Sequence, residues 1–147
     1  MIIKAWSINI MLYRKKIKVK TERGVSYVEL TRAIEKVIEE SGVKDGICNI
    51  ALKATTAGLL INEHDLLLLK DFERFFKELI KENRLYAHPD NAFSHLRASL
   101  LKNEITLPIE NGKLVLGTWQ SILLFEFDIR DREREIVVTI IGEGEKE

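Results

Sequence analysis

The 147-residue chain has few of the residues that carry most protein chemistry. It contains three histidines, one cysteine (Cys48) and a single glutamine (Gln120). A lone cysteine excludes an internal disulfide, and its place in the apolar run 47–52 predicts a small buried residue. This cysteine usage fits a reducing compartment, so we expect a cytoplasmic protein.

Long hydrophobic runs and an excess of one charge are also absent. No apolar stretch approaches the roughly 20 residues of a membrane span, and the segment 1–7 is not typical of a signal peptide. The 23 basic residues balance 23 acidic ones, which argues against a nucleic-acid binder. The Lys- and Glu-rich composition is one that proteins of thermophiles favour. We therefore expect a thermophile protein that binds neither membranes nor nucleic acids.

Hydrophobic patterning predicts one α+β domain over residues 1–147, a mostly antiparallel β-sandwich with two or three helices. Alternating apolar residues predict these strands: 6–12, 17–21, 48–52, 59–62, 105–107 (closed by Pro108), 113–116, 119–128 and 136–141. Turns are expected at 14–16, at 45–46 and at Asn111-Gly112, a dipeptide typical of tight hairpins.

Helical spacing predicts three helices. The first covers 30–41 and ends at Gly42, a natural C-terminal cap. The second follows Asp65 and buries a stripe that includes Phe75 and Leu79. The third is a short helix that starts after residue 90 or 91 and runs to about residue 101.

The segment Leu116–Ile122 is the most unusual part of the chain. Gly117, Trp119 and Gln120 occur together where an apolar strand is expected. Tryptophan brings a large apolar surface with an N–H that needs a partner, and glutamine is costly to bury unpaired. Two interpretations are open: a site or tight interface, and an ordinary strand start with a packed tryptophan.

Two histidines, His88 and His95, lie close together in the sequence. Pro89 interrupts the helix between them, so they converge only if the preceding loop folds back over the first helical turn. Neutral imidazoles with a nearby carboxylate are a common ligand set for a divalent metal, and Glu63, Asp65 or Asp90 could supply the carboxylate. The alternative is that both histidines are surface or capping residues.

Two other segments could bind an anion. Thr55 and Thr56 precede Gly58, and hydroxyls with backbone N–H groups at such a place can cradle an oxyanion. The alternative is an ordinary bulge or edge segment. Arg130, Arg132 and Arg134 alternate with acidic residues in the stretch 130–135, where the fork of one arginine could hold phosphate. A solvated turn with ion pairs is the alternative there.

Taken together, these segments resemble the YjbQ-like family, often described as secondary thiamine-phosphate synthases. The resemblance covers residues 6–143 and is most specific in two motifs, His95-Leu96-Arg97-Ala98-Ser99-Leu100-Leu101 and Leu116-Gly117-Thr118-Trp119-Gln120. It implies an α+β sandwich that assembles as a homotrimer and gathers its polar residues in one pocket for a metal or an anion. It also implies a weak transferase that joins a pyrimidine pyrophosphate to a thiazole phosphate.

The resemblance assigns roles to individual residues. It implies catalytic roles for His88, His95 and Glu63, with the two histidines as ligands of zinc or magnesium. It implies binding roles for Thr55, Thr56, Asn62, Asp90, Asn91, Trp119, Gln120 and Arg132. The family usually has a histidine immediately before the two hydroxyl residues, where this chain has Ala54. The alternative function is therefore a non-catalytic trimer that binds a small molecule or an anion in a degenerate pocket.

The expected strand 119–128 adds a physical argument for assembly. It carries apolar residues on both faces. A helix can cover one face, and the other needs a partner sheet or a second subunit.

Ala54→His tests the lost ligand position. A methyl group cannot bind a metal, and water in its place is a weaker ligand, so we expect weak or absent metal in the unmodified protein. The substitution is expected to restore metal uptake. Elemental analysis of the two purified proteins side by side measures this. Stoichiometric metal in the unmodified chain would show that another residue has taken over the role.

Overall fold

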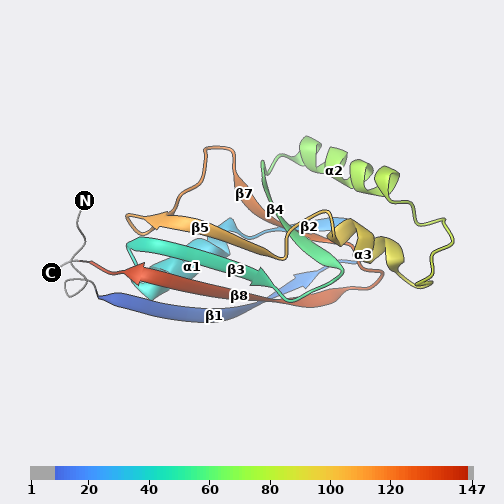
Figure 1. Ribbon diagram of the computed structural model, residues 1–147. Coiled ribbons are helices and arrows are strands. Elements are labelled where there is room, and N and C mark those ends of the chain that lie inside the picture. The colour runs from blue at the N-terminus through green and yellow to red at the C-terminus, as the bar shows by residue number, and fades with distance from the viewer. Residues whose placement is uncertain (1–8, 146–147) are drawn as a thin grey trace.

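The computed structural model describes residues 9–145, which form two antiparallel sheets and three helices (Figure 1). The larger sheet has the order β1 (Ile10–Thr21), β8 (Arg132–Glu143), β3 (Asp45–Leu52), β5 (Glu104–Glu110) and β6 (Lys113–Leu114). The smaller sheet has the order β2 (Ser26–Glu29), β7 (Ser121–Glu126) and β4 (Ala57–Asn62). The predicted α+β class with mostly antiparallel strands is confirmed.

Local signals placed the helices well. Helix α1 (Thr31–Ser41) ends at Gly42, whose φ of 73° is the left-handed conformation that favours glycine. Helix α2 (Leu66–Leu79) starts at Asp65, whose Oδ1 accepts hydrogen bonds from the backbone N–H groups of residues 67 and 68. Helix α3 (Ala92–Ala98) is a short helix after the loop that carries His88. Of the described helices, not one combines the length and apolar character that crossing a membrane requires.

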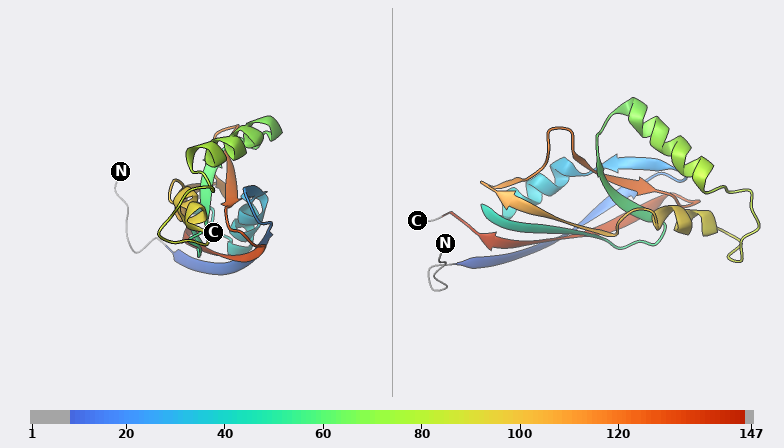
Figure 2. Two further views of the ribbon diagram at one scale, coloured as in Figure 1. Left: turned by 90° about the vertical axis from the view of Figure 1, so that its right-hand side faces the viewer. Right: turned by 45° about the horizontal axis from the view of Figure 1, so that its top comes forward.

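Two hydrophobic clusters hold the layers together (Figure 2). The larger cluster lies between the large sheet on one side and α1 with the small sheet on the other. The smaller cluster lies on the far side of the small sheet, where Leu69 and Phe76 of α2 pack on Leu123, Phe125 and Phe127. Cys48 is fully buried in the larger cluster, as predicted, and burial raises the pKa of its thiol to about 12.

Strand β7 is therefore covered on both faces within one chain. Ile122 and Leu124 face the larger cluster, and Leu123 and Phe125 face α2. Of the two alternatives for the second face, a partner sheet and a second subunit, the structure shows the partner sheet: α2 covers one face of β7 and the large sheet lies over the other. The small sheet has three strands and is narrow, so α2 buries only part of its apolar surface. Phe75 and Leu79, expected on the buried stripe, are 52% and 53% exposed.

Several predicted turns and strand ends are also wrong. No turn interrupts residues 14–16, and β1 runs straight through its lysines: Lys15 is partly buried and pairs with Glu40 of α1, while Arg14 and Lys16 are exposed. Strand β5 continues through Pro108, whose carbonyl accepts from the N–H of Val115 at 3.0 Å. Trp119 precedes β7 instead of opening it. The part of the expected first strand before residue 9 lies outside the described residues.

Gly46, expected in a turn, lies inside β3 opposite Gly142 of β8. The two strands approach so closely that a Cβ at Gly46 would overlap the carbonyl oxygen of Ile141 and lie 2.6 Å from the Cα of Gly142. These obstacles are backbone atoms, which cannot rotate away as a side chain can. Glycine is required here for close approach of the backbones.

Gly46→Ala is expected to lower the free energy of unfolding by about 2–4 kcal/mol, because β3 and β8 must separate to admit the methyl group. Denaturant unfolding measures the change. Gly117→Ala is the matched control, since a Cβ there would meet first the end of the Gln120 side chain, at 3.3 Å. Equal stability of the Gly46→Ala and control variants would contradict the close approach.

Candidate functional site

A buried polar cluster joins the two sheets. Arg134 of β8 binds both carboxylate oxygens of Glu126 in β7 through Nε and Nη2, with an Nε–Oε2 distance of 2.8 Å. Thr21 of β1 donates to Glu126 at 2.6 Å, and Thr56, just before β4, accepts from Arg134 at 2.7 Å. All four residues are buried, and we call them the polar clasp. It fixes where β4 begins relative to the end of β7.

Asp128 lies two residues beyond Glu126 and is buried as well. Its Oδ2 accepts from Nε of Arg132 at 2.7 Å, and Nη2 of Arg132 lies 2.6 Å from the same oxygen in a salt bridge. Its Oδ1 accepts from the backbone N–H of Ile129 and from Nδ2 of Asn91, at 2.8 and 3.1 Å. Burial alone would raise the pKa of this carboxyl, but these hydrogen bonds outweigh it and lower the pKa to about 2. Asp128 is therefore a charged anchor for Arg132 and Asn91.

The loop before α3 brings the two histidines together. The ring centroids of His88 and His95 are 5.2 Å apart, and the rings meet edge to face. Nε2 of His88 lies 2.9 Å from Oδ1 of Asn91, so a chain of hydrogen bonds runs from His88 through Asn91 to Asp128. Asn91 stands at the start of α3 but does not cap it with its side chain, which makes these two contacts instead.

These residues surround an open cavity of about 460 Å³. Its walls come from both sheets and from α3. They consist of Lys53, Ala54, Thr55, Thr56, Asn91, His95, Asp128, Arg132 and Arg134. Nζ of Lys53 lies 3.6 Å from Oε1 of Glu135. The buried carboxylates of Asp128 and Glu126 hold the two arginines. Fixed cationic groups, hydroxyls and an imidazole thus converge on a space that would hold a phosphate group.

Not all expected site residues reach this cavity. Asn62, Glu63, Trp119 and Gln120 lie at the opposite end of β4 and β7, where Asn62 pairs in register with Ser121. Glu63 was expected beside the histidines. Within one chain it lies at the other end of β4, so this expectation is wrong for the single chain. Asp90 is exposed and does not line the cavity. The structure therefore divides the expected pocket into two separate groups.

The cavity also contains groups that sequence reasoning missed, namely Lys53 and Asp128, with Glu126 behind Arg134. A signal for Glu126 was present in the sequence. It shares a strand face with Ile122 and Leu124, so alternation places its carboxylate in the apolar interior. A buried carboxylate requires a cationic partner, which the stretch 130–135 could have supplied.

The donor set does not fit a metal within one chain. Among residues 9–145, no cluster of three histidine, cysteine or acidic side chains could hold a metal ion. Ala54 lies in the cavity wall with His95, and its methyl group offers no ligand atom. His88 and His95 alone are two ligands, fewer than protein metal sites use.

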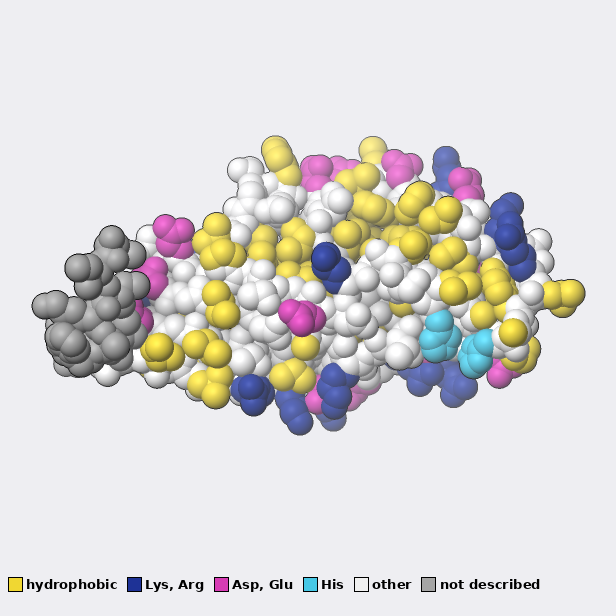
Figure 3. All heavy atoms as spheres, in the orientation of Figure 1, with side chains coloured by type: hydrophobic (Ala, Val, Ile, Leu, Met, Phe, Trp, Pro, Cys, Tyr) yellow, Lys and Arg dark blue, Asp and Glu magenta, His cyan; other side chains and the backbone are white. Residues whose placement is uncertain are grey.

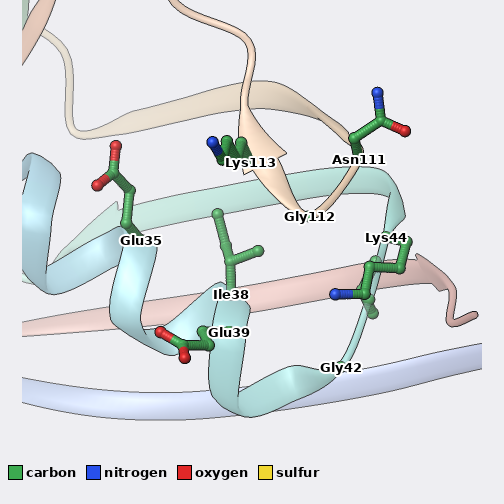
Figure 4. A pocket seen from close by; sticks show the side chains of 9 residues that line it. Glu35, Ile38, Glu39, Gly42, Lys44, Asn111, Gly112 and Lys113 are labelled. Carbon is green, nitrogen blue, oxygen red and sulfur yellow. The ribbon is translucent and has the colours of Figure 1, made fainter.

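A second cavity, of about 430 Å³, lies between the end of α1 and the β5–β6 hairpin (Figure 4). Ile38 is buried at its floor, and the charged groups around it are Glu35, Glu39, Lys44 and Lys113. It contains no histidine and no polar side chain that is buried. The cavity beside His95 is therefore the candidate site.

Solved structures share this arrangement of two sheets. The chain superposes on the crystal structure of a YjbQ-like protein of unknown function from Sulfolobus solfataricus with a TM-score of 0.87 and 40% sequence identity, covering 92% of this chain and 100% of that one. A hypothetical protein from Aeropyrum pernix gives a TM-score of 0.84 at 31% identity, with coverages of 89% and 99%. At these identities the likeness extends beyond the fold.

The sequence comparisons then place the chain. The model of the family described as "UPF0047 protein YjbQ-like" matches residues 15–143. A UPF0047 protein from Methanothermobacter thermautotrophicus is 37% identical over 134 residues, which cover 89% of this chain and 93% of that protein. The chain belongs to the YjbQ (UPF0047) family, as the resemblance predicted.

Asp128→Asn tests the charged anchor through acid stability. The folded pKa of Asp128, about 2, lies below its ordinary value of 3.8. The ionised carboxylate therefore contributes about 2 kcal/mol at neutral pH, and this is lost as the pH falls from about 4 to about 2. The variant is expected to be less stable at pH 7 and to lose less stability over that acid range. Urea unfolding at several pH values measures both effects.

The control for this prediction is Asp90→Asn, which changes an exposed carboxyl in the loop beside His88. It is expected to follow the unmodified protein at every pH. If Asp128→Asn also keeps the full acid dependence, Asp128 is not the anchor.

Proposed function

We propose that this YjbQ-family protein binds the phosphate of a small phosphorylated molecule in the cavity beside His95. The observation that carries the proposal is the state of Arg132. Two of its nitrogens bind a single oxygen of Asp128, while Nη1 makes no hydrogen bond to any described residue. The side chain is 39% exposed in the cavity wall. Asp128 thus fixes the guanidinium in place and leaves donors for an incoming anion.

Three further features support phosphate as the ligand. Lys53 adds a cation to the same wall, and Thr55 and Thr56 add hydroxyls and backbone groups. His95 contributes an imidazole that can donate to a phosphate oxygen. The buried carboxylates behind the arginines orient them before the ligand arrives, so little entropy is lost on binding.

The second candidate function is a transferase of the thiamine-phosphate synthase type. The paired rings of His88 and His95 beside the cavity favour it, since imidazoles can transfer protons at neutral pH. Arg132 and Lys53 would stabilise the negative charge on a leaving pyrophosphate. We assign no step to a metal, because the donor set in one chain does not fit one. A homotrimer and a cytoplasmic location complete the proposal.

Titration with inorganic phosphate, followed by ³¹P NMR, tests the binding site. Arg132→Gln removes a charge-assisted hydrogen bond and is expected to weaken binding by about 10- to 100-fold. Lys53→Gln is expected to weaken it as well. The matched control is Arg130→Gln, an exposed arginine two residues away that does not line the cavity. Equal losses in the Arg132→Gln and control variants, or no binding to the unmodified protein, would contradict the proposal.

A further inference from the structure

Trp119 is presented to solvent on a rigid turn. The side-chain oxygen of Gln120 accepts from the backbone N–H of Gly117 at 2.7 Å, and the N–H of Gln120 donates back to the Gly117 carbonyl at 3.1 Å. These two bonds close the turn, and Trp119 at its tip is 72% exposed. Figure 1 shows the loop before β7 standing away from both sheets. A fixed, exposed tryptophan is typical of a residue that anchors an interface.

Glu63 lies at the same end of the small sheet. Its neighbour Asn62 pairs with Ser121, which places Glu63 beside the turn that carries Trp119. The side chain of Asn62 accepts from the backbone N–H of Glu63 at 2.8 Å and so fixes the end of β4. The carboxylate of Glu63 makes no hydrogen bond or ion pair to another residue of the described part of the chain. This end of the molecule therefore offers an indole, an amide and an acid.

The cavity at the other end of β4 offers the complementary groups. A six-residue strand separates the two ends by about 20 Å, so Glu63 and Trp119 cannot reach the cavity of their own chain. The cavity has cations and the imidazole of His95, with the His88 ring next to it, and among residues 9–145 no acidic side chain hydrogen-bonds to either histidine. Leu96, which follows His95 in α3, and Leu100, just after the helix, are 43% and 48% exposed. Figure 3 shows two neighbouring histidines next to a surface where hydrophobic side chains gather.

We propose that the Trp119 turn of a second copy of this chain docks beside His88 and His95, so that the site is shared between two protomers. One protomer supplies the cationic wall, the threonines and the histidines. The other supplies Glu63, Trp119 and Gln120, with the indole on the exposed leucines and the carboxylate toward the imidazoles. The role of this shared site in binding phosphate rests on the proposed function.

The symmetry of such a contact favours a ring. The surface that gives Trp119 and the surface that receives it are different, so the contact is head-to-tail and each protomer uses both surfaces. A closed ring of three copies satisfies every protomer and agrees with the homotrimer proposed above. It also buries the exposed tryptophan and gives a partner to the half-buried carboxylate of Glu63.

Light scattering at micromolar concentration tests the assembly. The unmodified protein is expected to have three times the chain mass of 17.0 kDa. Trp119→Ala is expected to shift it to the monomer, because the anchor of the interface is lost. The matched control is Leu12→Ser, which removes a hydrophobic side chain of similar exposure from the outer face of β1. A monomeric unmodified protein, or a Trp119→Ala variant with unchanged mass, would overturn the proposal.

Disulfide crosslinking tests the geometry without any ligand. The only native cysteine, Cys48, is buried and unreactive, so any disulfide that forms comes from the introduced thiols. Thr118→Cys with Leu96→Cys is expected to give covalent multimers on mild oxidation. The two positions are too far apart in one chain for an internal bridge. Each single variant, and Thr118→Cys with Leu12→Cys, are controls expected to remain uncrosslinked. Absence of multimers in the first pair would overturn the docking.

The two proposals can fail separately. If the Thr118→Cys and Leu96→Cys pair crosslinks but the unmodified protein does not bind inorganic phosphate, the shared interface is supported and the proposed function is rejected. If phosphate binds, Trp119→Ala is expected to weaken binding by at least 10-fold, although Trp119 lies outside the cavity of its own chain. Unchanged phosphate affinity in Trp119→Ala would show that the site is complete within one protomer and would overturn the shared site.

Discussion

The fold depends on one buried ion pair, between Arg134 of the large sheet and Glu126 of the small sheet. Each charge would be very costly to bury alone, and removal of one partner from such a pair typically costs about 3–5 kcal/mol. Because Thr21 and Thr56 also bind this pair, three strands and the start of a fourth, from two sheets, are fixed at one point. Arg132, Asp128 and Thr55 lie within two residues of members of the clasp. The ion pair that aligns the two sheets therefore also positions the residues that line the cavity.

The parts of the fold that sequence predicted well are those that neighbouring residues decide. Gly42 ends α1, Asp65 starts α2, and Asn111-Gly112 turns a hairpin in which both residues have positive φ. The failures have a different origin. The lysines of residues 14–16 suggested a turn, but a lysine stem can lie along an apolar surface, and the partly buried Lys15 pairs with Glu40. That partner belongs to α1, which the local sequence of β1 does not reveal.

The candidate site shows the same limit. The pairing of His88 with His95 and the nearness of Thr55 and Arg132 were within reach of sequence reasoning. The role of Asp128 was not, because one of the hydrogen bonds that keep it ionised, beside those from Ile129 and Arg132, comes from Asn91, 37 residues away in the chain. A family resemblance gathers the residues of one pocket without saying which chain each comes from. For this reason Glu63 and Trp119 were expected beside the histidines, whereas the register of β4 with β7 places them at the opposite end.

The side chain of Asn91 determines which ring nitrogen of His88 carries the hydrogen. Its amide nitrogen donates to the ionised Asp128, which can only accept, so its oxygen must be the atom that faces His88. An amide oxygen accepts, and Nε2 of His88 must therefore carry the hydrogen. In its neutral form His88 is the Nε2–H tautomer, with the lone pair on Nδ1. Any ligand, substrate proton or metal that binds this imidazole has a single nitrogen, Nδ1, through which to do so.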